Sequence, residues 1–332
     1  MTRTFDLLNL RESGHPGISR LFARAHTHGW NVEKDVDWKI RLDADDPVMK
    51  PGWAPYSRTR SFQKLPKDVQ ARFSRRAFSW TLNSLQLGES VALEVCLKIA
   101  QLSRLEDYRN HATAQAMDEA RHHHVYVRLI DRMEQEPEEI DQGTRGLFDQ
   151  VLQADRLVDL VAWEQFYLES VAMNVLRAVK DQALNPLVKR IFALNLRDES
   201  RHMGFGVMFV EAYLQSIPLD ERITFARRWL NQMLPMTFGG QDPVTPQRLM
   251  RWLYDAGAPD AVQLGMTMMA EQLPIMQKQY EDVTTGKRVP QELKSARRAG
   301  LMAPEILEAL GLSDHPVILG ALKSAPDQDA DV

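Results

Sequence analysis

Met117-Asp118-Glu119-Ala120-Arg121-His122 is nearly repeated further along the chain as Arg197-Asp198-Glu199-Ser200-Arg201-His202. Each copy has the pattern Asp-Glu-x-Arg-His and lies inside a run with helical periodicity. Residues three positions apart lie on one side of a helix, so the Glu and the His of one copy can reach a single point beside it. Two such helices facing each other would offer two Glu and two His to a shared site.

Two further carboxylates lie in apolar helical runs, where an isolated charge is costly to bury. Glu89 lies in the run that ends near Leu102, and Glu164 lies in Val161-Ala162-Trp163-Glu164-Gln165-Phe166-Tyr167. Four Glu and two His from four helices are the ligand set of dinuclear carboxylate bundles. The sequence therefore predicts an all-α fold, a ferritin-like four-helix bundle core with extra N- and C-terminal helices.

Breaks in the helical pattern divide the 332 residues into four parts. Residues 1–64 contain clustered Pro and Gly with recurring Trp, and we expect an N-terminal arm that packs on the bundle. Helical periodicity with short joins predicts the bundle itself over 65–216. Residues 217–320 hold shorter, Met-rich helical segments, a C-terminal extension in which Met is expected to fill the core. The polar residues 321–332 predict a disordered tail.

Charge and composition argue against several classes of protein. Lys and Arg total 41 against 45 Asp and Glu, a net charge of −4, which argues against broad nucleic-acid binding. The single cysteine, Cys96, excludes an intramolecular disulfide and fits a reducing compartment. The chain shows no signal-peptide pattern and no uncharged apolar run long enough to cross a bilayer. We expect a cytoplasmic protein without a membrane contact.

The converging carboxylates predict a metal pair, because buried ionised groups need compensating charge. Four Glu and two neutral His around two divalent ions cancel formal charge, and oxygen-rich sites with one imidazole per metal suit iron or manganese better than zinc. The predicted ligands are Glu89 and His122 on one metal and Glu164 and His202 on the other, with Glu119 and Glu199 bridging.

Two other glutamates compete for the places of the single Glu. Glu94 and Glu169 lie five positions beyond Glu89 and Glu164, and on an α-helix this spacing carries them well round the axis. Glu94 could substitute for Glu89. We expect Glu169 to lie beside the ligands or at the surface.

Charged residues flank the predicted ligands in both copies of the repeat. A metal-bound His usually donates its other ring N–H to a carboxylate or carbonyl, and Asp118 and Asp198 are placed to serve the His of the opposite helix. Arg121 and Arg201 are suited to pair with those acids. An ordinary salt bridge is the alternative interpretation for each of these four residues.

The remaining histidines are expected to lie outside the site. His123 and His124 point to other helix faces than His122, and His111 is expected to be unrelated to the metals. Tyr126 lies one turn beyond His122 on the same face. A core tyrosine is the default interpretation, and a redox-active or substrate-gating tyrosine is the alternative.

The order of the ligands resembles the ferritin-like di-iron carboxylate superfamily, closest to the branch that holds the ribonucleotide reductase small subunit and the ligand-binding oxidases. The stretch from Trp30 to Trp38 and the helix entry at Leu65-Pro66 are similar to that branch. The resemblance implies that Trp30 joins Asp198 and His122 in a hydrogen-bonded link from the metal to the surface.

Individual subfamilies of this superfamily have diagnostic residues, and this chain differs at several of them. It has no aromatic residue after Tyr280, where a reductase subunit has a radical-relaying tail, although Tyr126 matches the place of the radical tyrosine. The ligand-binding oxidases have a cross-linking tyrosine where this chain has Asp159. The arylamine N-oxygenases have an added histidine where this chain has Asn195.

The primary hypothesis is an O2-activating non-haem di-iron oxidase or oxygenase of the monooxygenase type. Two Fe ions, or a Mn/Fe pair, would use O2 to oxidise a small organic substrate in an adjacent apolar pocket. An external ferredoxin or reductase would supply electrons, because the chain has no flavin or iron–sulfur motif, and a homodimer is plausible. The alternatives are a radical-generating ribonucleotide reductase small subunit and a non-catalytic ferritin-like metal-binding protein.

Overall fold

The computed structural model describes residues 15–43, 47–134, 138–140, 142–238 and 244–324, with the side chains of 235–238 left out. Regular structure within these ranges is helical, and the pairing outside helices is limited to an isolated bridge between Met49 and Ala183. The prediction of an all-α fold is confirmed.

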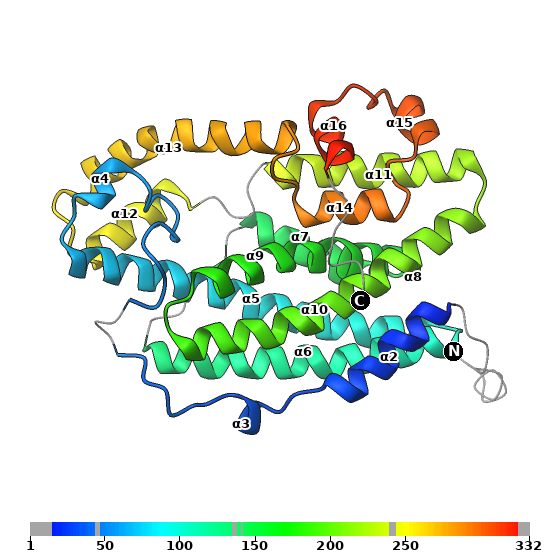
Figure 1. Cartoon of the computed structure of the whole chain (residues 1–332), viewed down its shortest axis with the longest axis horizontal. Coiled ribbons are helices and arrows are strands. Elements are labelled where there is room, and N and C mark those ends of the chain that lie inside the picture. The colour runs from blue at the N-terminus through cyan, green and yellow to red at the C-terminus, as the bar shows by residue number, and fades with distance from the viewer. Residues whose placement is uncertain (1–14, 44–46, 135–137, 141, 239–243, 325–332) are drawn as a thin grey trace.

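Four long helical segments form a ferritin-like bundle (Figure 1). Short connections join the first segment to the second and the third to the fourth, and the first two segments pack along most of their length. At the last connection, Pro186 occupies the first helical turn and the Asn185 side chain accepts the Leu187 N–H. The four segments are α5 (Lys67–Leu102), α6 (Glu106–Met133), the run α8 (Leu157–Val161), η1 (Ala162–Leu168) and α9 (Glu169–Gln182), and α10 (Pro186–Ser216).

The third segment is α-helical at both ends and π-helical in its middle part, η1. A glycine of α10 lets the two backbones approach closely there. A Cβ at Gly206 would lie 2.4 Å from the carbonyl carbon of Gln165 and 2.6 Å from the Phe166 nitrogen, distances at which no side chain fits. Gly206 therefore sets the spacing between α10 and η1.

The residues before the bundle pack against two different parts of the molecule. α2 (Pro16–His28) lies against α6 and α10, and short helices α3 (Val32–Asp35) and α4 (Arg60–Gln63) follow. Trp30 and Met49 are buried in one hydrophobic cluster with bundle residues such as Phe192. α2 and this cluster cover one face of the bundle, whereas α4 packs against α13 (Ala261–Thr284), one of the later helices.

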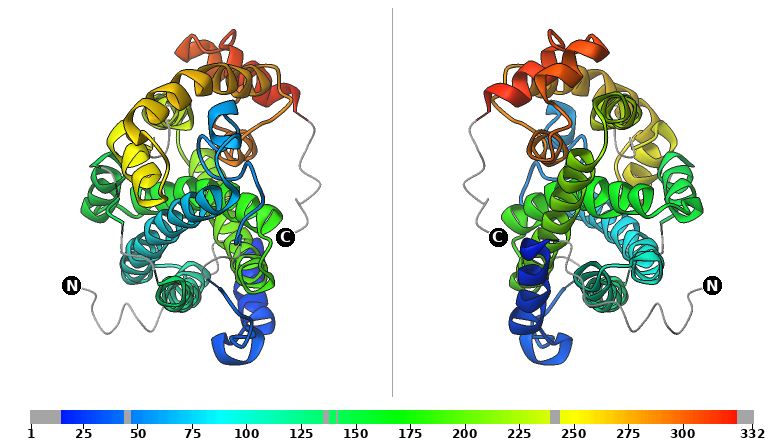
Figure 2. Two further views of the ribbon diagram at one scale, coloured as in Figure 1. Left: turned by 90° about the vertical axis from the view of Figure 1, so that its left-hand side faces the viewer. Right: turned by 90° about the vertical axis from the view of Figure 1, so that its right-hand side faces the viewer.

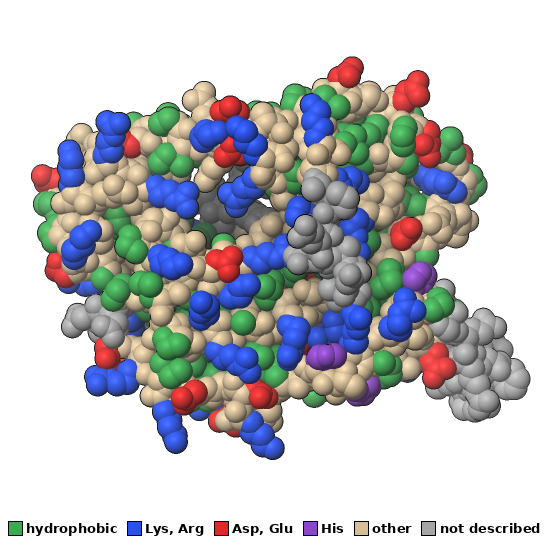
Figure 3. All heavy atoms as spheres, viewed as in Figure 1, with side chains coloured by type: hydrophobic (Ala, Val, Ile, Leu, Met, Phe, Trp, Pro, Cys, Tyr) green, Lys and Arg blue, Asp and Glu red, His purple; other side chains and the backbone are tan. Residues whose placement is uncertain are grey.

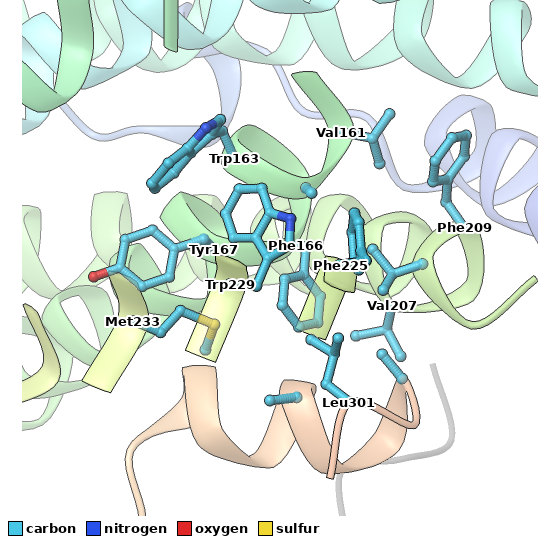
Figure 4. Close-up of a cluster of buried hydrophobic side chains, with 14 of the residues drawn as sticks. Val161, Trp163, Phe166, Tyr167, Val207, Phe209, Phe225, Trp229, Met233 and Leu301 are labelled. Carbon is cyan, nitrogen blue, oxygen red and sulfur yellow. The ribbon is translucent and has the colours of Figure 1, made fainter. Parts of the chain in front are cut away.

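The later helices lie on the opposite side of the bundle from α2 (Figure 2). Trp229 packs on Trp163 of the bundle with ring centroids 4.4 Å apart, and Figure 4 shows Val207 and Leu301 nearby. These helices are α11 (Leu219–Phe238), α12 (Pro246–Asp255), α13 (Ala261–Thr284), α14 (Gln291–Arg298), α15 (Pro304–Leu310) and α16 (Pro316–Lys323). Of the predicted tail, 321–323 belong to α16, and 325–332 lie outside the described residues.

Charged and hydrophobic side chains are interspersed over the surface of the molecule. Figure 3 shows Lys and Arg side chains scattered over the face of Figure 1, which is hollowed below α13. None of the described helices is both long and apolar enough to cross a bilayer.

Candidate metal centre

Six titratable side chains from all four bundle segments meet in the interior. α5 provides one glutamate, α6 and α10 each provide a glutamate and a histidine, and α9 provides the fourth glutamate. None of the six is more than 8% exposed. They are Glu89, Glu119, His122, Glu169, Glu199 and His202.

The first group gathers around the Nδ1 atom of His122. This nitrogen lies 3.1 Å from Glu119 Oε2, 3.0 Å from Glu199 Oε1 and 3.6 Å from Glu89 Oε2. One ligand atom from each of these residues lies within 4.8 Å of the others. Four donors this close are arranged to share one cation.

The second group gathers in the same way around the Nδ1 atom of His202. This nitrogen lies 2.7 Å from Glu199 Oε2, 3.2 Å from Glu119 Oε1 and 3.4 Å from Glu169 Oε1. Glu119 and Glu199 belong to both groups, each with its two oxygens turned to different imidazoles. Their position between the groups is typical of carboxylates that bridge two metals.

Glu169 occupies the position in the second group where the sequence analysis expected Glu164. Glu164 is also buried, at 3% exposure, and its Oε2 atom has no hydrogen-bond partner in the described part of the chain. Both side chains face inward because η1 lies between them: hydrogen bonds from residue i to i+5 place residues five apart nearly above one another. On α5, which has no such segment, Glu89 is buried and Glu94 is exposed.

Each imidazole forms a hydrogen bond with an aspartate of the other repeat, through the ring nitrogen that faces away from the glutamates. His122 Nε2 lies 3.2 Å from Asp198 Oδ2, and His202 Nε2 lies 3.1 Å from Asp118 Oδ2. A carboxylate accepts the N–H at Nε2, which leaves Nδ1, on the side of the glutamates, as the nitrogen that a metal would take up. The Trp30 indole N–H also donates to Asp198, at 2.6 Å.

Two arginines complete this outer ring. Arg121 donates to Asp198 at 2.9 Å and also pairs with Asp118. Arg201 lies 3.0 Å from Asp118 and 2.9 Å from Asp198. The hydrogen bond and charge of His122, and after them the charge of Arg201, outweigh burial and hold the pKa of Asp198 below its usual value.

The charges of the centre call for cations. Burial raises the pKa of Glu89, Glu164 and Glu169 well above the ordinary value. Burial would also raise the pKa of Glu199, but the neighbouring imidazoles outweigh it and lower the pKa. Carboxylates packed this closely must hold either protons or metal ions. The four carboxylates of the two groups cancel the charge of two divalent ions, so the donor set fits a metal pair.

Gln115 is a residue of this centre that the sequence analysis did not consider. Its side-chain nitrogen donates to Glu119 Oε1 at 2.9 Å and to Glu169 Oε1 at 2.8 Å. It lies one helical turn before Glu119, on the same face. A polar residue four positions before Glu119 is the sequence feature from which this contact could have been predicted.

The other histidines and the tyrosine lie outside both groups. His123 contacts Gln86, and His124 is exposed. His111 is buried, with its ring stacked on Phe205 and centred 6.5 Å from the ring of His202. Tyr126 is fully buried, and burial raises the pKa of its phenol well above the usual value.

A cavity of about 270 Å³ opens beside the centre, between α5, α7 (Gln142–Gln153) and the η1 to α9 run. Glu89, Glu164, Glu169 and Glu199 form its inner wall, and most of the remaining wall is apolar. Its volume lies just below the range of about 300 to 1,000 Å³ that is usual for ligand cavities. The cavity can therefore present one small molecule to the carboxylate centre.

The sequence profile of the p-aminobenzoate N-oxygenase family, AurF, matches residues 15–240. The chain belongs to this family. Comparison with individual curated proteins gave no match. AurF proteins are di-iron ferritin-like oxygenases, so this chain is an O2-activating non-haem di-iron oxygenase of the monooxygenase type, with two iron ions and O2 as co-substrate. Neither the reductase-subunit alternative nor the metal-binding alternative gains support.

Membership in the AurF family makes one substituted position informative. Asn195, at the place of the added histidine of arylamine N-oxygenases, is fully buried on α10. Neither polar atom of its amide has a hydrogen-bond partner among the described residues. This chain thus offers two imidazoles to its metals, one in each group.

Proposed function

We propose that this AurF protein oxygenates the nitrogen of a small aromatic amine. One observation supports the proposal above the others: three members of the two overlapping ligand groups, Glu89, Glu169 and Glu199, line a cavity of about 270 Å³. The family supplies the reaction class, and the cavity supplies a place where a single ring meets the metal ligands.

We propose a ligand set in which the protein holds each metal with one imidazole and three carboxylates. When bound, the two iron ions activate O2. Glu164 is left outside this set, and its unpartnered Oε2 lies among the groups that line the cavity. The proposed ligands are Glu89 and His122 for one metal, Glu169 and His202 for the other, and Glu119 and Glu199 between them.

The protein's own groups orient the reactants and exclude water. The ligands are buried, and the apolar wall holds the ring of the substrate. Glu164 Oε2 is placed to accept a hydrogen bond from the substrate amine, which turns the nitrogen toward the centre. Conversion of the amine to a hydroxylamine inserts one oxygen atom of O2 into an N–H bond, while the other atom leaves as water with two electrons and two protons.

The two electrons require an outside source, and we propose a cytoplasmic ferredoxin or reductase. Assembly as a homodimer is a further proposal. Several exposed apolar side chains of α13 support it, because they offer a surface for a second copy: Val262, Met266, Leu273 and Met276. Light scattering on the purified protein would decide between a monomer and a dimer.

The proposed reaction is tested by isotope transfer. Iron-loaded, chemically reduced protein is mixed with 18O2 and a panel of simple anilines, and the products are analysed by mass spectrometry. We expect 18O on the nitrogen of at least one aniline. Glu119→Ala should abolish the product, whereas Glu94→Ala, an exposed glutamate of α5, should retain it. Absence of labelled product from protein with two bound irons would overturn the proposal.

A further inference from the structure

The lining of the cavity has a one-sided charge. Its ionisable side chains, among the described residues, are four glutamates and one tyrosine, with no Lys, Arg or His. The outer wall is apolar and aromatic, formed by residues such as Leu85, Leu147, Phe148 and Val171. A substrate in this cavity therefore meets carboxylate, uncharged polar and apolar side chains, and no cationic side chain, on the described sides.

A carboxylate on the substrate would be poorly accommodated there. A buried carboxylate needs a cationic or multiply hydrogen-bonding partner, because removal from water otherwise costs several kcal/mol. The cation that lies nearest along the chain to the lining is Arg145, which is exposed on α7 beside Thr144.

Uncharged polar residues, by contrast, are part of the lining, among them Thr81 and Ser84 of α5. The Ser84 hydroxyl oxygen is buried and has no hydrogen-bond partner among the described residues, and Ser84 lines the cavity. Ser84 precedes Glu89 by five residues, which on an α-helix is about 7.5 Å along the axis. That separation suits a single ring with an amine at one end and an uncharged polar group at the other.

We infer that this AurF protein takes an uncharged single-ring arylamine, and that it discriminates against the p-aminobenzoate anion. The inference rests on the proposed N-oxygenation and adds the charge of the substrate. The observation behind it is the pairing of a cation-free lining with the unpartnered Ser84 hydroxyl.

Two probes of nearly equal shape separate charge from size. p-Aminobenzamide and p-aminobenzoate differ at pH 7.5 by one negative charge. Calorimetric binding to the full-length, iron-loaded protein is measured for both, and 18O2 turnover is measured in parallel. We expect the amide to bind and to react at least about a hundredfold more efficiently than the anion.

The outcomes distinguish this inference from the proposed function. Equal or tighter binding of p-aminobenzoate overturns the inference, and so does binding of neither probe. Dependence of anion turnover on the Arg145 side chain, shown with Arg145→Ala, also overturns it. Selective binding of the amide without labelled product from any aniline leaves the charge preference standing and removes the N-oxygenation.

A designed variant tests the same inference in the opposite direction. Ser84→Lys introduces a cation into the lining, and Ser84→Met provides a side chain of similar length without charge. The ratio of anion to amide affinity should rise at least about tenfold in the Lys variant relative to the Met variant. An unchanged ratio in two folded, iron-loaded variants would contradict the inference.

Discussion

Each imidazole of the centre has one kind of partner at its Nε2 atom and another kind at its Nδ1 atom. At Nε2 an aspartate lies 3.1 to 3.2 Å away, and at Nδ1 three glutamates converge. Since the aspartates are held ionised by two arginines, they accept the N–H and fix the tautomer. The repeated Asp-Glu-x-Arg-His pattern thus builds both halves of the centre from one set of contacts.

Gln115 provides the first prediction at the scale of single residues. Its amide tethers Glu119 and Glu169, so Gln115→Met should weaken the affinity for one of the two metals by about 10- to 100-fold. Metal titration of the apoprotein measures this effect. Gln86→Met, which removes the same group from a pair with His123, should leave both affinities near those of the wild type. Equal losses in the two variants would contradict the role of Gln115.

His111 predicts a dependence of stability on pH. Burial, with the nearby charges of His202 and Arg201, lowers its pKa to about 3 from 6.5, and Asp118 acts in the opposite direction. The unfolded chain therefore gains a proton below pH 6.5 that the native state does not, and stability falls as the pH drops. Between pH 7.5 and 5.5 this histidine should remove roughly 1.4 kcal/mol.

Comparison with His111→Gln isolates this contribution. The free energy of unfolding from urea titrations at pH 7.5 and 5.5 should fall more in the wild type than in the variant. Parallel losses in the two proteins would show that His111 does not stay neutral in the folded state.

At this scale the sequence was sufficient where contacts follow from α-helical spacing. The Glu-x-x-His pairs and Asp118 and Asp198 could be placed from the repeat alone. Glu169 could not, because its direction depends on a π-helical segment that no residue pattern announced. Gln115 contacts Glu169 on another helix, and such a contact cannot be predicted from the residue pattern of one helix alone.

The decisive element is η1, which brings Glu164 and Glu169 to one face. Its wider turn lets one carboxylate enter the second ligand group while the other lines the cavity. π-helical segments inside α-helices are frequent at functional sites. Gly206, which has no side chain, lets the backbone of α10 approach the π-helical turn closely at Gln165.

Gly206→Ala tests the coupling of this packing to the centre. The added methyl group would collide with the backbone of η1, so we expect a loss of about 1 to 3 kcal/mol in unfolding free energy and reduced metal content. Gly204→Ala is the matched control, since a Cβ there would meet Leu21 at an ordinary 3.6 Å. Metal analysis and urea unfolding of both variants provide the comparison. Equal behaviour of the two variants would contradict the role assigned to Gly206.

Across the whole molecule, the bundle shares one hydrophobic core with α11, α14, α15 and α16, and α12 packs in a second cluster with the start of α5. Trp163 of η1 packs on Trp229 of α11, and Ser170 of α9 hydrogen-bonds Ser295 of α14 at 2.8 Å. Helical periodicity predicted that these C-terminal segments are helices. It could not predict where they dock, because docking depends on side chains from distant parts of the chain.

The shared core predicts cooperative unfolding. Trp229 is fully buried, and Trp229→Ala should lower the unfolding free energy by about 3 to 5 kcal/mol. Far-UV circular dichroism and loss of bound metal should report the same shifted midpoint. A variant in which the metal-binding bundle unfolds at the wild-type midpoint would show that the C-terminal helices are an independent unit.

The central claim is a metal pair held by six side chains from four helices. Its most direct test is a crystal structure of iron-loaded protein with anomalous scattering, together with metal counts for Glu169→Ala and Glu164→Ala. We predict two iron ions, one beside His122 and one beside His202, with Glu169 bound and Glu164 unbound. Glu169→Ala should lose one ion, and Glu164→Ala should keep both. Fewer than two ions in the wild type, or a metal bound by Glu164 in place of Glu169, would contradict the account.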